Sequence, residues 1–122
     1  LHSVRAKVSG LSGGQRQAIA IARAVGTESS VVMLDEPTAA LGVAQTYQVL
    51  QVVKRLRDTN HAVVYISHNM QDIFDISDRI TVLRHGQNVA TYITSKTTPD
   101  EVVMAMTKGI DKKTSGSIQN AI

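Results

Sequence analysis

Two short stretches of the sequence hold the residue types that chemistry on phosphate groups requires. The first, Leu11 to Gln15, reads Leu-Ser-Gly-Gly-Gln and sets a glycine pair at the start of a helical pattern. The free backbone N–H groups and the positive dipole end of such a helix favour a bound anion. The second, Val31 to Glu36, is an apolar run that ends in two carboxylates, which can organise a metal ion and a water molecule. Together they predict chemistry on a phosphorylated nucleotide.

The elements that must position these stretches alternate between helix and strand. The expected order is a helix over Gln15 to Val25, a strand over Val31 to Leu34, a helix over Val43 to Arg57, a strand over Ala62 to Ser67 and a short helix over Asn69 to Ser77. The second helix has Val43, Tyr47, Leu50 and Val53 at helical spacing, and the wholly apolar first strand suits burial on both faces. A strand, helix, strand succession with short links predicts a right-handed parallel crossover.

The remaining sequence predicts a strand pair, a helix and a tail. Arg79 to Leu83 and Asn88 to Ile93 form the strand pair, which turns around a His-Gly dipeptide. A capping box with proline at the first helical position predicts a helix from Thr98 to about Thr107. The stretch over residues 108–122 is rich in lysine, serine and glycine, has no periodicity and is expected to be a loose tail.

Asp35 and Glu36 follow the first of the two parallel strands, and His68 follows the second. Both strands end at the carboxyl edge of their sheet, so these side chains are expected where ligands of open α/β sheets bind. Each feature alone has an ordinary explanation. Acids at a strand end are usually solvated, a single histidine is usually a surface residue, and a Ser-Gly-Gly stretch can be only a helix cap. Their joint placement favours a functional site.

Composition excludes several classes of protein. The 122 residues include no cysteine, which excludes disulfides and thiolate metal sites. Aromatic residues make up 3%, too few for the stacking surfaces of single-strand binders, and the basic residues are scattered among acids despite a net charge of +3. No apolar run reaches the length of a membrane span, and no signal peptide is apparent. We therefore expect no nucleic-acid partner, and one domain or part of one.

These residues resemble the motifs of ABC-type ATPases. Leu11 to Gln15 is similar to the signature motif of that family, Val31 to Glu36 to its Walker B strand, and His68 to its switch histidine. The order and spacing of the motifs agree from Ser9 to about Leu83. The resemblance implies an α/β fold, in which a P-loop NTPase-like parallel sheet is flanked by helices.

The phosphate loop of that family, Gly-x-x-x-x-Gly-Lys-Ser/Thr, occurs nowhere in the sequence. The glutamine loop and the adenine-stacking aromatic residue, which lie upstream in the family, are also missing. The resemblance therefore implies that residues 1–107 are the C-terminal part of an ATPase domain and that residues 108–122 are a flexible tail. The complete domain, with its phosphate loop, is called the parent domain below. The chain alone is expected neither to bind ATP tightly nor to hydrolyse it.

The resemblance implies a role for each site residue. Asp35 would hold Mg²⁺ beside the phosphates of ATP, and Glu36 would polarise the attacking water as a general base. His68 would hydrogen-bond the γ-phosphate. Four residues would bind the γ-phosphate of an ATP molecule held mainly by a second ATPase domain: Ser12, Gly13, Gly14 and Gln15. Two such domains would enclose two ATP molecules head to tail.

Within the family, the stretches Glu36 to Val43 and Ile66 to Met70 resemble ATPases of bacterial carbohydrate importers of the ribose/fructose type. Gly42 departs from the family pattern, which usually has an aspartate there. The resemblance implies a peripheral protein at the cytoplasmic face of the inner membrane, with permease subunits and, indirectly, a sugar-binding protein as partners. The rival interpretations are an ABC-type ATPase of nucleic-acid maintenance or translation and a non-catalytic interaction fragment. The sequence has no sustained heptads of the kind that coiled-coil insertions in the first rival need.

Overall fold

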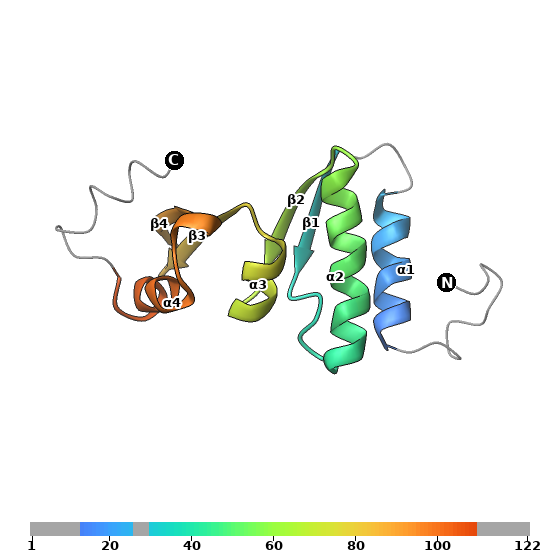
Figure 1. Cartoon of the computed structure of the whole chain (residues 1–122), viewed down its shortest axis with the longest axis horizontal. Helices are drawn as coiled ribbons and strands as arrows, with labels where there is room; N and C mark the ends of the chain where they lie inside the picture. The colour runs from blue at the N-terminus through green and yellow to red at the C-terminus, as the bar shows by residue number, and fades with distance from the viewer. Residues whose placement is uncertain (1–12, 26–29, 110–122) are drawn as a thin grey trace. The chain divides into compact units, whose positions relative to one another are not determined.

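The computed structural model describes residues 13–25 and 30–109 (Figure 1). The elements in chain order are α1 (Gly13–Val25), β1 (Val31–Asp35), α2 (Val43–Asp58), β2 (Ala62–Ile66), α3 (Met70–Ile76), β3 (Arg79–Arg84), β4 (Gln87–Ile93), the 3-10 turn η2 (Thr94–Lys96) and α4 (Pro99–Lys108). This order confirms the predicted alternation of helices and strands. The chain divides into two units between Asn69 and Met70. None of the described helices is long and apolar enough to cross a bilayer.

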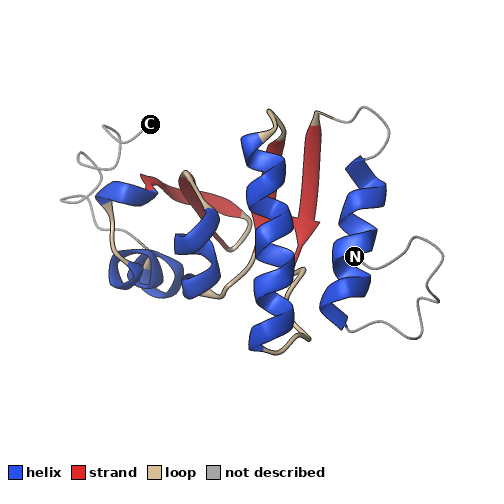
Figure 2. Cartoon of the chain, turned by 45° about the vertical axis from the view of Figure 1, so that its right-hand side comes forward, coloured by secondary structure: helices blue, strands red, loops and turns tan. Residues whose placement is uncertain are grey.

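The first unit is built on a parallel pair of strands joined through a helix. The pairing of β1 with β2 runs from Val31 opposite Ala62 to Asp35 opposite Ile66. Helix α2 links the two strands and contacts β2, and α1 packs against α2 (Figure 2). The predicted parallel strand, helix, strand succession is therefore confirmed, and both strands end at one edge of the sheet.

Only one face of this sheet is covered by the described residues. Side chains alternate along β1, so that Val32 and Leu34 are buried while Met33 is 70% exposed. On β2, Val64 and Ile66 share the exposed face with Met33, because residues paired across a sheet point to the same side. The prediction that the first strand is covered on both faces is wrong for the described part of the chain. A wholly apolar strand can be buried on both faces, but among the described residues the helices cover only one face of β1.

The buried stripe of α2 differs from the one that its sequence spacing predicted. Leu50 and Val53 are buried as expected, but Val43 is 91% exposed and Tyr47 is also exposed. The four buried side chains of α2 are Val49, Leu50, Val53 and Leu56. The stripe begins late because the first turns of α2 meet α1 through polar residues at Gln45 and Gln48, where they approach a glycine.

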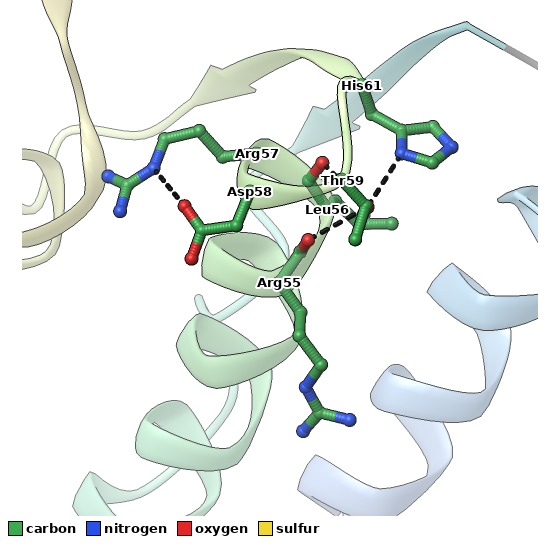
Figure 3. Close-up of polar contacts among 6 residues, drawn as sticks. All are labelled: Arg55, Leu56, Arg57, Asp58, Thr59 and His61. Carbon is green, nitrogen blue, oxygen red and sulfur yellow. Dashed lines mark hydrogen bonds and ion pairs between the residues drawn. The ribbon is translucent and has the colours of Figure 1, made fainter.

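Thr59 closes the C-terminal end of α2 (Figure 3). Its hydroxyl lies 2.9 Å from the carbonyl oxygen of Arg55, 3.1 Å from that of Leu56 and 3.1 Å from Nδ1 of His61. A hydroxyl carries one proton, which the two carbonyls share, so the His61 ring completes the cluster by donating from Nδ1. Asn60 follows with a φ of 64°, the left-handed conformation in which asparagine often ends a helix. These contacts satisfy carbonyls that the helix end leaves without partners.

The second unit is an antiparallel hairpin packed against a helix. Strands β3 and β4 pair from Arg79 opposite Ile93 to Arg84 opposite Gln87, with an irregularity between Val82 and Leu83. The two residues of the turn are His85, with a φ of 52°, and Gly86, with a φ of 75°. Two positive φ values in a two-residue loop match the twist of a hairpin, and the predicted His-Gly turn is confirmed.

Helix α4 and the hairpin share one apolar core. The buried members of this core are Ile73, Ile80, Val82, Ala90, Tyr92, Val102 and Ala105. The helix starts as predicted, because the Thr98 hydroxyl accepts a hydrogen bond from the backbone N–H of Glu101 at 3.3 Å and proline occupies the first turn. Most of the predicted tail, residues 110–122, lies outside the described residues.

Candidate functional site

Glu36 and His68 meet at the carboxyl edge of the parallel strands. His68 Nδ1 lies 2.8 Å from Glu36 Oε1, and this distance is typical of a charge-assisted hydrogen bond. The His68 side chain is 78% exposed and the Glu36 side chain 35% exposed, so solvent reaches both groups. Because a carboxylate only accepts, the ring must carry its proton at Nδ1. The sequence predicted that both residues lie at this edge of the sheet, which the parallel pairing confirms, but it did not predict their contact.

An unusual backbone conformation places Glu36. Its φ is 48°, in the left-handed region that side-chain-bearing residues rarely adopt. Its N–H donates to the carbonyl of Ile66 at 2.8 Å, and its carbonyl accepts from the N–H of Ala39 at 3.3 Å. The parallel pairing is thereby extended one residue past the end of β1, and the chain turns at once. A strained residue held by such bonds is typical of functional sites.

Asp35 is the last residue of β1 and is exposed. No group of three or more His, Asp or Glu side chains that could hold a metal ion by themselves occurs within residues 13–25 and 30–109. The donor set is compatible with Mg²⁺, because this ion usually binds one or two carboxylates and completes its shell with waters and substrate phosphates. Asp35 therefore offers one carboxylate of the kind that Mg²⁺ binds together with substrate phosphates.

The glycine pair opens α1 and packs against the chain that follows β1. A Cβ atom added at Gly13 would lie 2.9 Å from Leu41 Cδ2, and one added at Gly14 would lie 2.7 Å from Gln45 Cα. Both distances are too short for ordinary contact. Glycine is needed for packing at position 14, where the obstacle is backbone, whereas at position 13 the end of the Leu41 side chain would have to shift. Gln15 follows in the first turn of α1 and is half-buried. Ser12, the remaining predicted phosphate ligand, lies outside the described residues.

Leu41 and Gln45 are neighbours of the glycine pair that were not predicted from the sequence. Gln45 also caps α2, since its Oε1 accepts from the N–H of Gly42 at 2.7 Å. This is one half of a capping box, because glycine has no side chain to complete the other half. A glutamine three residues after the N-cap position Gly42 was a signal for the cap. No sequence signal indicated the approach to the glycines, because it depends on how two helices pack.

Comparison with known proteins finds relatives of this chain among the ATP-binding proteins of ABC transporters. Residues 2–39 match the family model described as ABC transporter. The ribose import ATP-binding protein of Geobacillus kaustophilus is 46% identical over 96 residues, which are 79% of this chain and 19% of that protein. The fructose import ATP-binding protein of Rhizobium meliloti is 40% identical over 107 residues, 88% of this chain and 41% of that protein. The chain thus spans about a fifth of the ribose relative and two fifths of the fructose relative.

Solved structures show the same fold. An ABC transporter of metal-chelate type in an inward-facing conformation matches with a TM-score of 0.74 at 31% identity, over 86% of this chain and 42% of that chain. The dimeric structure of a bacterial ABC transporter cassette matches with a TM-score of 0.60 at 29% identity, over 72% of this chain and 38% of that one. The predicted α/β fold, part of a P-loop NTPase-like domain, is confirmed.

Proposed function

Because the chain is a relative of the ATP-binding proteins of ABC transporters, we propose that it forms part of an ATPase subunit that powers the import of a sugar. The observation that carries the chemistry is the 2.8 Å contact between Glu36 and His68 beyond two parallel strand ends. A carboxylate and an imidazole stand there at the sheet edge where ligands of α/β proteins bind. The reaction is hydrolysis of ATP.

Glu36 is the general base in this proposal. Its carboxylate is partly exposed, so water can reach it and lose a proton to it. His68 binds the γ-phosphate through Nε2, because Nδ1 is engaged with Glu36. A neutral ring protonated at Nδ1 has no proton on Nε2 and could not donate to phosphate oxygen. Donation to the phosphate through Nε2 therefore requires a proton on each of the two ring nitrogens.

Asp35 and the glycine end of α1 complete the phosphate contacts. Asp35 contributes a carboxylate toward Mg²⁺, and the bound ion would neutralise charge on the phosphates of ATP. The backbone N–H groups at the start of α1 suit an anion, because they lack helical partners. Four residues bind the γ-phosphate of the nucleotide held by a second ATPase domain: Ser12, Gly13, Gly14 and Gln15.

The sugar assignment and the partners rest on the relatives. The similar proteins include ATP-binding proteins for ribose and fructose import, and three of them are 39–46% identical to this chain over 79–88% of its length. The proposed partners are a second ATPase domain, membrane permease subunits and, indirectly, a sugar-binding protein. The subunit would act peripherally at the cytoplasmic face of the inner membrane. ATP-driven dimerisation of the ATPase domains would drive the permease.

Replacing Glu36 by glutamine in the parent domain tests this function. Glu36→Gln keeps the shape of the side chain and removes its basicity, so turnover should fall by about 10²-fold or more while nucleotide binding persists. Glu101→Gln makes the same chemical change at an exposed position of α4 and should leave turnover unchanged. Near-normal turnover in Glu36→Gln would remove Glu36 from the role of base.

A further inference from the structure

Leu41 joins the loop after β1 to the glycine end of α1. Its Cδ2 atom occupies the space where a side chain at Gly13 would begin, 2.9 Å from an added Cβ. Gly14 differs from Gly13, because a Cβ added at Gly14 would meet a backbone atom, Gln45 Cα, 2.7 Å away. Gly13 therefore faces the end of a flexible side chain, and Gly14 faces a fixed helix.

The loop that carries Leu41 is tied back to Glu36 by consecutive turns. Leu41 N–H donates to the carbonyl of Thr38 at 3.1 Å, and Ala39 N–H donates to the carbonyl of Glu36 at 3.3 Å. Thr38 is buried, and its hydroxyl lies 3.4 Å from the hydroxyl of Tyr65 on β2. These hydrogen bonds connect the backbone of Leu41 with that of Glu36 within one short loop.

We propose that Leu41 is a positioning residue that holds the glycine end of α1 at a fixed position relative to Glu36. This inference rests on the proposed function, in which that helix end binds a nucleotide on a second domain while Glu36 serves the chain's own domain. The Leu41 side chain would then connect the group that acts on the second domain's nucleotide with the group that acts on the nucleotide of the chain's own domain. The absence of a side chain at Gly13 would then leave room for the Leu41 side chain as well as for the approach of a phosphate.

A size exchange between the two positions tests the proposal in the parent domain. Gly13→Ala should displace Leu41 and lower kcat for ATP about tenfold, with KM for ATP unchanged, because misplaced groups slow the chemical step. Leu41→Val removes bulk at the contact. The double variant Gly13→Ala/Leu41→Val should recover most of the lost kcat, since the smaller side chain makes room for the methyl group.

Gly14→Ala provides the matched control. The atoms that its methyl group meets belong to Gln45 and Gln48 of α2 and include the Gln45 backbone, so Leu41→Val should not rescue it. If Gly13 served only the approach of a phosphate, Leu41→Val could not rescue Gly13→Ala either. A double variant as slow as Gly13→Ala alone would therefore overturn the positioning role.

A measurement on this chain without nucleotide separates the inference from the proposed function. Nuclear Overhauser contacts between a Leu41 methyl group and Gly13 Hα should be present, and Gly13→Ala should shift the Leu41 methyl resonances. Absence of these contacts would overturn the inference whatever the enzyme does. If the contacts are present and the Glu36→Gln parent domain still turns over ATP normally, the proposed function fails instead. The contact between Leu41 and Gly13 would then exist but would have no role in ATP hydrolysis.

Discussion

His68 and Glu36 are 32 positions apart in the sequence, yet His68 Nδ1 lies 2.8 Å from Glu36 Oε1. The contact arises because β1 and β2 are parallel and in register to their last residues, so that the chain leaves both strands at one edge. The left-handed conformation of Glu36 then turns the chain immediately after β1. A local distortion and a long-range pairing together create the site.

The two side chains should act as one unit in the parent domain. His68→Ala should lower ATP turnover by about 10²-fold, because it removes the donor to the γ-phosphate and leaves Glu36 without its partner. Combined with Glu36→Gln, it should lower turnover little beyond the slower single variant. Steady-state rates of the four proteins measure this coupling. Fully additive losses in the double variant would show that the two residues act independently.

This chain alone should neither bind ATP tightly nor hydrolyse it, because the Gly-x-x-x-x-Gly-Lys-Ser/Thr loop that supplies most of the phosphate grip is absent from its sequence. Titration with Mg-ATP in a calorimeter should give no saturable heat at micromolar nucleotide. The parent domain is the positive control for the same titration. Saturable binding of ATP to the chain alone would show that tight binding does not depend on the phosphate loop.

Gly13→Asp should separate the two nucleotide sites of the parent dimer. The added carboxylate would bring a negative charge to the helix end that is proposed to bind the γ-phosphate, and like charges at close range repel. Monomeric ATP binding should survive, since the monomer's own phosphate loop and Asp35 are unchanged. ATP-driven dimerisation should fail, and size-exclusion chromatography in the Glu36→Gln background measures it. A Glu36→Gln/Gly13→Asp variant that still dimerises with ATP would refute the signature assignment.

Gly42→Asp should stabilise the first unit. Gly42 has an extended conformation, with φ −76° and ψ −179°, which any residue can adopt. An added Cβ would lie 2.8 Å from Oε1 at the end of the Gln45 side chain, which must move aside, and the aspartate carboxylate can then accept a hydrogen bond from the first turn of α2 in its place. Its negative charge also suits the helix N-terminus, so the free energy of unfolding should rise by about 0.5 kcal/mol. Urea denaturation measures the change. Gly42→Ala is the control, and equal stability of the two variants would exclude a capping effect.

Tyr92 should make the second unit lose stability in alkali. Burial raises the pKa of Tyr92 above its ordinary value of 10.0, and the nearby charge of Glu101 raises it further. The folded state therefore holds the proton more tightly than the unfolded state. The stabilisation is complete below pH 10 and is lost as the pH rises through the folded pKa, at up to about 1.4 kcal/mol per pH unit.

Tyr92→Phe should abolish this alkaline loss of unfolding free energy, because the phenylalanine ring has no proton to release. Tyr47→Phe is the matched control, since Tyr47 is 64% exposed, and should keep the loss. Denaturation curves between pH 9 and about pH 12 measure both variants. An undiminished alkaline slope in Tyr92→Phe would assign the loss to another group.

Local rules in the sequence were sufficient for much of the fold. The His-Gly turn, the Thr98 cap and the helix–strand order follow from φ preferences, capping and periodicity, which act over a few residues. Side-chain burial was less predictable. Val43 and Tyr47 fit a helical stripe and are exposed, and the apolar strand β1 has one open face. Burial depends on which elements pack there, and neighbouring residues do not encode it.

The sequence by itself determined which residue types are available at the site and that Asp35, Glu36 and His68 follow two strands in succession. Only the tertiary structure decided that Glu36 and His68 touch, because their contact depends on the register of β1 and β2 and on one left-handed residue. The packing of Gly13 on Leu41 and of Gly14 on Gln45 was decided in the same way. A glycine in a sequence shows that close approach is allowed, and the packing of two helices decides what approaches.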